Sequence, residues 1–210
     1  MTAPAKPIRI LLVDDHPLLR MGIVALAADE ADMHFVAEAS NGSEAVDLYR
    51  RHRPDVTLMD LQMPEMNGID AMLAIRDEFP DARFIVLTTY TGDVQVMRAL
   101  RAGARAYLLK SLLRKELLET IRSVHAGHKR IPPEIASQLA DHAADDALTS
   151  REIDVLRLIA TGLANKIVAD KLDITEETVK GHVKNILSKL GANDRTHAVT
   201  IALKRGIIDL

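Results

Sequence analysis

The chain of 210 residues has no cysteine, no tryptophan, and only three tyrosines and three phenylalanines. The absence of cysteine excludes disulfides, thiolate metal sites and cysteine nucleophiles, and it fits a cytoplasmic protein. So few aromatic side chains leave little for the stacking platforms that bind single-stranded nucleic acids. No apolar run approaches the roughly 18 residues that a membrane-spanning helix needs. The first apolar run ends at Asp14, so we expect neither a secretory leader nor a membrane partner.

The sequence also lacks a large excess of charge of either sign, because its formal net charge is -3. It is 48% hydrophobic and 27% charged, which is typical of globular proteins and excludes wholesale disorder. The charges are unevenly distributed. Residues 147–210 hold 10 Lys and Arg against 8 Asp and Glu, whereas the preceding residues are net acidic. This last segment is therefore the candidate for contact with a polyanion.

The first 125 residues alternate short apolar runs with amphipathic stretches. The apolar runs are almost continuous, as expected for strands that helices cover on both faces of a sheet. The alternation predicts an α/β domain with a doubly wound, five-stranded parallel sheet. We expect strands over residues 9–13, 34–39, 55–59, 83–88 and 104–109, and helices over 18–28, 43–51, 69–78, 93–102 and 114–125.

In the remainder of the chain, the sequence pattern changes at residue 125 and again at residue 147. Residues 125–146 contain a Pro-Pro pair and an Ala/Asp-rich end, which predict a linker with one short helix over 133–141. Residues 147–210 show no strand pattern and predict an all-α domain of four helices, of which the second and third form a helix-turn-helix. Thr149 and Glu152 form a capping box at the start of the first helix. The expected domains are 1–124, 125–146 and 147–210, and the four helices are 150–160, 166–172, 175–190 and 194–205.

Polar side chains gather where the predicted strands end. Because the carboxyl ends of parallel strands meet at one edge of a sheet, we expect them to share a crevice. Three converging carboxylates repel one another unless a cation joins them, and oxygen ligands suit Mg²⁺. A carboxylate, a metal, a lysine and a hydroxyl are also the groups that phosphoryl transfer needs. Each aspartate taken singly could instead be a helix N-cap. The six residues are Asp14, Asp15, Asp60, Thr88, Thr89 and Lys110, with Asp60 as the candidate nucleophile.

Four segments carry a resemblance to a known family. LLVDDHPLLRMGI, VTLMDLQMPEMNGIDAM, IVLTTY and GARAYLLK resemble the receiver domain of two-component response regulators, over residues 8–124. The resemblance implies that Asp60 accepts a phosphoryl group. It also implies that Asp15, Asp60 and the backbone carbonyl of Gln62 hold Mg²⁺, with help from Asp14.

The same resemblance assigns roles at the ends of the last two strands. It implies that Thr88 and Lys110 bind the phosphoryl group, with Thr89 beside them. Tyr107 would be the aromatic residue whose rotamer follows phosphorylation, although an ordinary core position is the alternative. The chain departs from many relatives at Ser111, which stands where Asp or Pro usually follows the lysine.

The last segment resembles the LuxR-type DNA-binding domain, so the whole chain resembles a NarL/FixJ-type response regulator. On the third helix, apolar residues at helical spacing form a buried stripe, and Lys180 and Lys184 fall off that stripe on a common face. The resemblance assigns base and backbone contacts to these two lysines. Three departures bear on sequence specificity: Ala164 in place of a capping Ser or Thr, Ile167 in place of Glu, and Gly181 inside the recognition helix. The residues expected in phosphate contact or local framework are Asn165, Lys166, Thr178, His182 and Asn185.

The expected function is transcription regulation rather than catalysis. A partner histidine kinase, or a small phosphodonor, phosphorylates Asp60, and a homodimer then binds double-stranded promoter DNA. The fourth helix, with Val199 and Leu203, is either the dimer face of the DNA-binding part or ordinary core. One alternative is an aspartyl-phosphate phosphatase of the haloacid-dehalogenase type, although Asp14-Asp15-His16 lacks its D-x-D pattern. The other is a regulator that is never phosphorylated and uses its first domain for dimerisation or ligand sensing.

Overall fold

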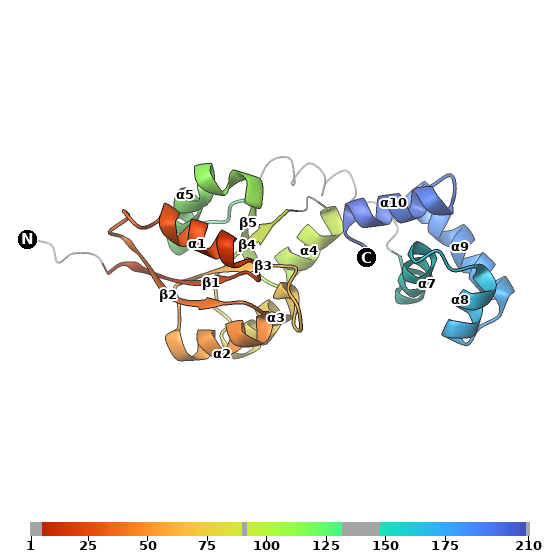
Figure 1. The fold of residues 1–210 in the computed structure, drawn as a ribbon, viewed down its shortest axis with the longest axis horizontal. Coiled ribbons are helices and arrows are strands. Elements are labelled where there is room, and N and C mark those ends of the chain that lie inside the picture. The colour runs from red at the N-terminus through yellow and green to blue at the C-terminus, as the bar shows by residue number, and fades with distance from the viewer. Residues whose placement is uncertain (1–5, 90–91, 132–147, 209–210) are drawn as a thin grey trace, which may run out of the picture. The chain divides into compact units, whose positions relative to one another are not determined.

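The computed structural model describes residues 6–89, 92–131 and 148–208. These residues form two compact units, one built on a sheet and one made of helices, and each unit is described by itself (Figure 1). The short helix predicted over 133–141 lies outside the described residues. Among the described residues, every helix is too short or too polar to cross a lipid bilayer.

The first unit contains a five-stranded sheet in which all strands are parallel. The strand order β2-β1-β3-β4-β5 confirms the predicted doubly wound sheet. The chain reverses its direction of winding between β1 and β3, and the crevice at that point is where ligands bind in such sheets. The strands are β1 (Ile8–Val13), β2 (Met33–Ala39), β3 (Val56–Asp60), β4 (Phe84–Thr88) and β5 (Ala104–Leu109).

Helices cover both faces of this sheet. α1 and α5 lie on one face, and α2 and α3 lie on the other (Figure 1). On the first face Ile23 of α1 and Ile121 of α5 pack in one cluster with Leu12 and Leu58. Every residue of β3 and β4 is buried, which is why their apolar runs are continuous. The helices of this unit are α1 (Pro17–Leu26), α2 (Gly42–His52), α3 (Gly68–Glu78), α5 (Leu113–His125) and, from residue 96 on, α4 (Asp93–Arg101).

The loop between β3 and α3 depends on a glycine. Asn67 caps α3, because its side-chain oxygen accepts a hydrogen bond from the backbone N of Asp70 at 3.0 Å. Gly68, the next residue, approaches the backbone of Asp60 so closely that a Cβ atom would lie 2.0 Å from the Asp60 carbonyl oxygen. The absence of a side chain at Gly68 therefore sets the path of the chain directly after Asp60.

The segment that follows α5 pairs with the edge of the sheet. The backbone N of Arg130 donates to the carbonyl oxygen of Arg105 at 2.8 Å, and the backbone N of Tyr107 donates to the carbonyl oxygen of Arg130 at 3.2 Å. This parallel bridge beside Ala106 extends the sheet past β5. The residues around Arg130 are thus fixed to the strand that carries Tyr107.

The second unit consists of α7 (Ser150–Ala160), α8 (Asn165–Leu172), α9 (Glu176–Leu190) and α10 (Arg195–Arg205). These helices confirm the predicted all-α domain. Asp173 ends α8 with φ 52, in the left-handed region that Asp tolerates, and it turns the chain toward Thr175. The side-chain oxygen of Thr175 accepts from the backbone N of Thr178 at 3.1 Å and so caps α9. A short turn between two helices is the helix-turn-helix arrangement.

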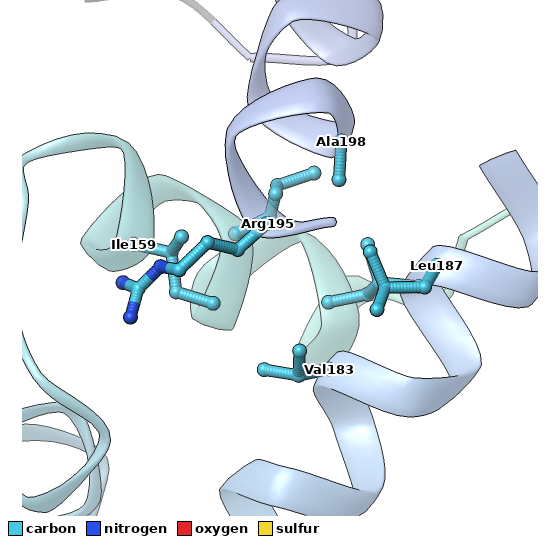
Figure 2. Close-up of a pocket in the computed structure, with 7 residues that line it drawn as sticks. Ile159, Val183, Leu187, Arg195 and Ala198 are labelled. Atoms are coloured by element: carbon cyan, nitrogen blue, oxygen red, sulfur yellow. The ribbon is translucent and has the colours of Figure 1, made fainter. Parts of the chain in front are cut away.

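The core of the second unit forms where three helices meet. Val183 and Leu187 of α9 point toward Ile159 of α7 and Ala198 of α10 (Figure 2). Val199 and Leu203 of α10 pack against the same core, which favours the core alternative for these residues.

A buried carboxylate, that of Glu152, links the start of α7 to the last turn of α9. Glu152 is 3% exposed, and its Oε2 accepts from the backbone N of Thr149 at 2.8 Å and from Nζ of Lys189 at 2.9 Å. Burial alone would raise the pKa of Glu152, but the hydrogen bonds from Thr149 and Lys189 outweigh it and lower the pKa. The predicted capping box at Thr149 is confirmed, and Lys189 is added to it.

Gly68→Ala is expected to lower the free energy of unfolding of the first unit by about 1–3 kcal/mol, because the new methyl group overlaps the Asp60 carbonyl. Gly22→Ala is the matched control, since a Cβ atom at Gly22 meets no atom within 4 Å and Gly22 lies inside α1. The control should gain about 0.5–1 kcal/mol. Urea titration followed by tyrosine fluorescence reports on this unit, because all three tyrosines precede residue 125. An equal change in the free energy of unfolding in the two variants would contradict the close approach of Gly68 to the Asp60 carbonyl.

Candidate functional site

The acidic residues predicted from the strand ends come together at the carboxyl edge of the sheet. Asp14 directly follows β1, and Asp60 is the last residue of β3. Asp14 is fully buried and Asp60 is 4% exposed. Ligand atoms of Asp14, Asp15, His16 and Asp60 all lie within 4.8 Å of one another. The neighbouring positions of β1 and β3 in the strand order produce this cluster, here called the acidic pocket.

Lys110 lies between two carboxylates of the acidic pocket. Its Nζ lies 2.8 Å from Oδ2 of Asp14 and 2.7 Å from Oδ2 of Asp60. Burial alone would lower the pKa of Lys110, but its hydrogen bonds to Asp14 and Asp60 outweigh that effect and raise the pKa. Lys110 is therefore a cation held between two buried carboxylates.

The pKa of Asp60 is raised, and burial is the main cause. The hydrogen bond from Lys110 and its charge work in the opposite direction, whereas the charge of Asp14 adds to the rise. The backbone N of Gln62 donates to Oδ1 of Asp60 at 3.3 Å. A buried carboxylate with a raised pKa is a better nucleophile than an exposed one, provided that a cation balances the charge that develops on its target.

His16 belongs to this cluster, although the sequence analysis assigned it no role. Its Nδ1 lies 2.6 Å from Oδ1 of Asp15 and 3.3 Å from Oδ1 of Asp14. Its backbone N donates to Oδ1 of Asp14 at 2.9 Å, at the residue that precedes α1. The only signal in the sequence was its position directly after the Asp pair, which does not tell on which side of the chain a side chain lies.

The predicted phosphoryl-binding residues fall into two groups. Thr88 ends β4 and is buried, and its side chain hydrogen-bonds with Tyr107. Burial raises the pKa of Tyr107 to about 12, and the hydrogen bond with Thr88 partly offsets this rise. Thr89, the next residue, is exposed and makes no side-chain hydrogen bond with any described residue. Thr88 and Tyr107 are thus linked across the neighbouring strands β4 and β5, whereas Thr89 has no such link to a described residue.

The predicted DNA contacts lie on α8 and α9. Val179 and Ile186 are the buried residues of α9, so the predicted apolar stripe does face the core. Lys180 and Lys184 are exposed, and Nζ of Lys180 lies 3.6 Å from carboxylate oxygens of both Glu176 and Glu177. Of the other candidates, Lys166, Thr178 and Asn185 are exposed, and Asn165 and His182 are partly buried.

The three sequence departures on these helices appear in the structure. Ala164 precedes α8 and provides no side-chain cap, as expected. Ile167 is 45% exposed, so an apolar side chain stands in solvent on α8. A Cβ atom at Gly181 would meet no atom within 4 Å, so the glycine is not required by packing. The α9 surface therefore has a gap without a side chain beside Lys180.

Comparison with known proteins identifies the family. Residues 10–122 match the response regulator receiver domain, and residues 146–202 match the bacterial regulatory proteins of the luxR family. The chain belongs to the LuxR-type response regulators. The receiver match contains the whole acidic pocket, and the luxR match contains α7, α8 and α9.

Relatives of this response regulator match it from end to end. It is 40% identical over 210 residues to the transcriptional regulatory protein LiaR of Bacillus subtilis, covering 96% of this chain and 100% of LiaR. It is 37% identical over 206 residues to the response regulator VraR of Staphylococcus aureus, covering 96% and 99%. The crystal structure of ChrA, a response regulator of a heme-sensing two-component system, has a TM-score of 0.57 at 36% identity and covers 96% and 99%. These relatives are regulators, so the phosphatase alternative is not supported.

Asp60→Asn is expected to stabilise the receiver at pH 7 by the order of 1 kcal/mol. Because the folded state raises the pKa of Asp60, the folded protein binds this proton more tightly than the unfolded chain does. Stability from this group is therefore full at low pH and is lost as the pH rises through the folded-state pKa. Asparagine cannot ionise, so the gain should be near zero at pH 4 and grow toward pH 7.

Urea titration in the presence of EDTA, with tyrosine fluorescence as the signal, measures this gain. The exposed Asp29→Asn is the matched control and should change stability by less than about 0.5 kcal/mol at either pH. A gain for Asp60→Asn that is larger at pH 4 than at pH 7 would contradict the burial argument.

Proposed function

We propose that this response regulator accepts a phosphoryl group on Asp60 and, once modified, binds double-stranded promoter DNA as a homodimer. The donor is a partner histidine kinase or a small phosphodonor. The observation that carries the proposal is the position of Asp60, a buried carboxylate whose Oδ2 lies 2.7 Å from the ammonium group of Lys110. A nucleophile beside a fixed cation is the arrangement that phosphoryl transfer requires.

The transfer is a displacement at phosphorus. An oxygen of Asp60 forms a bond to phosphorus while the bond from phosphorus to the donor breaks, and the electron pair of that bond leaves with the donor. Lys110 then balances the charge on the phosphoryl oxygens. Thr88, at the end of the neighbouring strand β4, is the hydroxyl donor in this proposal.

The acidic pocket also fits a divalent metal ion. Oδ2 of Asp14 and Oδ1 of Asp15 are buried oxygens whose polar contacts among the described residues are single ion pairs, with Lys110 and His16 respectively, so each has a lone pair left for a metal ion. Three carboxylates exceed the single charge of Lys110, and oxygen ligands of this kind suit Mg²⁺. Asp14, Asp15, Asp60 and the carbonyl of Gln62 would hold the ion, which would neutralise charge on the phosphoryl oxygens.

In this proposal, Thr88 transmits the phosphorylation of Asp60 to the rest of the receiver. Thr88 cannot keep its hydrogen bond with Tyr107 unchanged while its hydroxyl turns toward a phosphoryl group on Asp60. Tyr107 lies on β5, next to β4, and its backbone N holds Arg130. A change at Tyr107 therefore acts on the strand and on the segment that follows α5.

The DNA contact is proposed for the exposed face of α9. Lys180 and Lys184 lie on this face, one turn apart, and like charges at this spacing are unfavourable by a few tenths of a kcal/mol in isolation. Phosphates of a duplex turn this cost into a gain. We assign the positioning contacts to Lys166, Thr178 and Asn185, which are also exposed.

Acetyl phosphate with Mg²⁺ is expected to add one phosphoryl group to the wild-type chain, as measured by intact mass. Asp60→Asn should abolish the gain, and Lys110→Gln should slow it by at least about tenfold because the charge on the phosphoryl oxygens is no longer balanced. Asp47→Asn, an exposed position on α2, is the control and should react like the wild type. A wild-type chain that stays unmodified would favour the alternative, a regulator that works without phosphorylation.

Lys184→Gln is expected to weaken binding to a promoter duplex and to reduce the slope of log affinity against log salt by about 0.9, the loss of one phosphate contact. Fluorescence anisotropy at several salt concentrations measures both quantities. Lys115→Gln carries the same charge change on α5 of the receiver and should leave the slope unchanged. An unchanged slope in Lys184→Gln would remove Lys184 from the DNA interface.

A further inference from the structure

The receiver has a second charged site at the edge of the sheet opposite the acidic pocket. An open groove of about 320 Å³ lies there, where β5 begins. Four cationic side chains line it, and they come from four separate stretches of the chain. They are Arg76 of α3, Arg101 at the end of α4, Arg105 of β5, and Lys129 after α5. We call this site the basic groove.

The cations of the basic groove have no carboxylate partner within ion-pair distance among the residues that the structure describes. Some arginines of the same unit donate to backbone carbonyls, as Arg83 does to His125, but others pair with acids. Arg50 pairs with Glu78, and Arg122 pairs with Asp32 at 2.8 Å. Several like charges gathered in one concave place create a positive potential that attracts an anion.

The backbone holds two of the guanidinium groups in place. A Cβ atom at Gly103 would lie 2.5 Å from Cδ of Arg76 and 2.6 Å from its Nη1, so the Arg76 side chain crosses the glycine. Gly103 has φ 105, which suits glycine. Nη1 of Arg76 and Nη1 of Arg105 each donate one long hydrogen bond of 3.5 Å to a backbone carbonyl. The other N–H groups of both guanidinium groups are left for a ligand.

Lys129 reaches the groove because its neighbour Arg130 is bound to β5. The backbone N of Arg130 donates to the carbonyl of Arg105 at 2.8 Å, so Lys129 and Arg105 are held by one hydrogen-bonded pair of segments. The backbone beneath these side chains is therefore fixed before a ligand arrives, and the ligand would order the exposed Arg101 and Lys129 side chains.

We propose that the basic groove binds a small phosphate-bearing anion, of the pyrophosphate class. Forked arginine N–H groups match the oxygens of a phosphate group, and three arginines with one lysine suit an anion with more than one charge. The described residues that line the groove include no carboxylate that could accept a phosphoryl group, so the proposal is for binding and not for transfer. This proposal rests on the basic groove alone and does not depend on the role of Asp60.

The test uses the ¹⁵N-labelled full chain without Mg²⁺, titrated with pyrophosphate against NaCl of equal ionic strength. We expect amide shifts at Gly103, Arg105 and Gly127, and the double variant Arg105→Gln/Lys129→Gln should bind at least about tenfold more weakly. Arg114→Gln/Lys115→Gln has the same charge change at exposed positions of α5 and should bind like the wild type. Arg76→Gln alone should also weaken binding.

Two results would overturn the proposal. Amide shifts confined to α9, or an equal loss of affinity in the Arg114→Gln/Lys115→Gln control, would show that pyrophosphate is attracted to positive charge in general and not bound in the groove. The proposal would also fail if pyrophosphate did not bind. If, in addition, the full chain carrying Arg105→Gln/Lys129→Gln bound duplex DNA more weakly than the wild type, the groove would be assigned to the nucleic-acid backbone instead.

Discussion

The two ion pairs of Lys110 are the interaction on which the acidic edge of the receiver depends. Asp14 and Asp60 are buried side by side and would repel each other without this ammonium group. One lysine, however, neutralises only one negative charge. With Asp15 counted, the three carboxylates give the pocket an excess of negative charge. A phosphoryl group on Asp60 would compete with Asp14 for the same lysine, so modification at one residue alters the balance of all three carboxylates.

Most of the fold could be predicted from the sequence, because burial on both faces leaves continuous apolar runs. The predicted and observed strands differ by at most one residue at either end, as with 55–59 against Val56–Asp60, and β5 agrees at both ends. The long-range pairs could not be predicted. Lys189 completes the capping box of Glu152 from 37 residues away, and no local pattern contains that partner. His16 and Thr89 show the same limit, since the direction of a side chain after a strand depends on the loop that follows.

The two lysines of α9 look equivalent in the sequence but differ in the structure. Lys180 has two glutamates within 3.6 Å, in the first turn of its own helix, whereas Lys184 has no ion pair with a described residue. In the proposed DNA complex a duplex would have to displace these glutamates from Lys180 before it gained the full charge, whereas Lys184 would be available at once. The third turn of α9, which carries Lys184, would then be the stronger source of contact.

The buried Glu152 has a mechanical consequence for the helical unit. It receives hydrogen bonds from Thr149, which caps α7, and from Lys189 in the last turn of α9, so the start of one helix and the end of another share one carboxylate. A substitution at Glu152 would therefore uncap α7 and release the last turn of α9 at the same time.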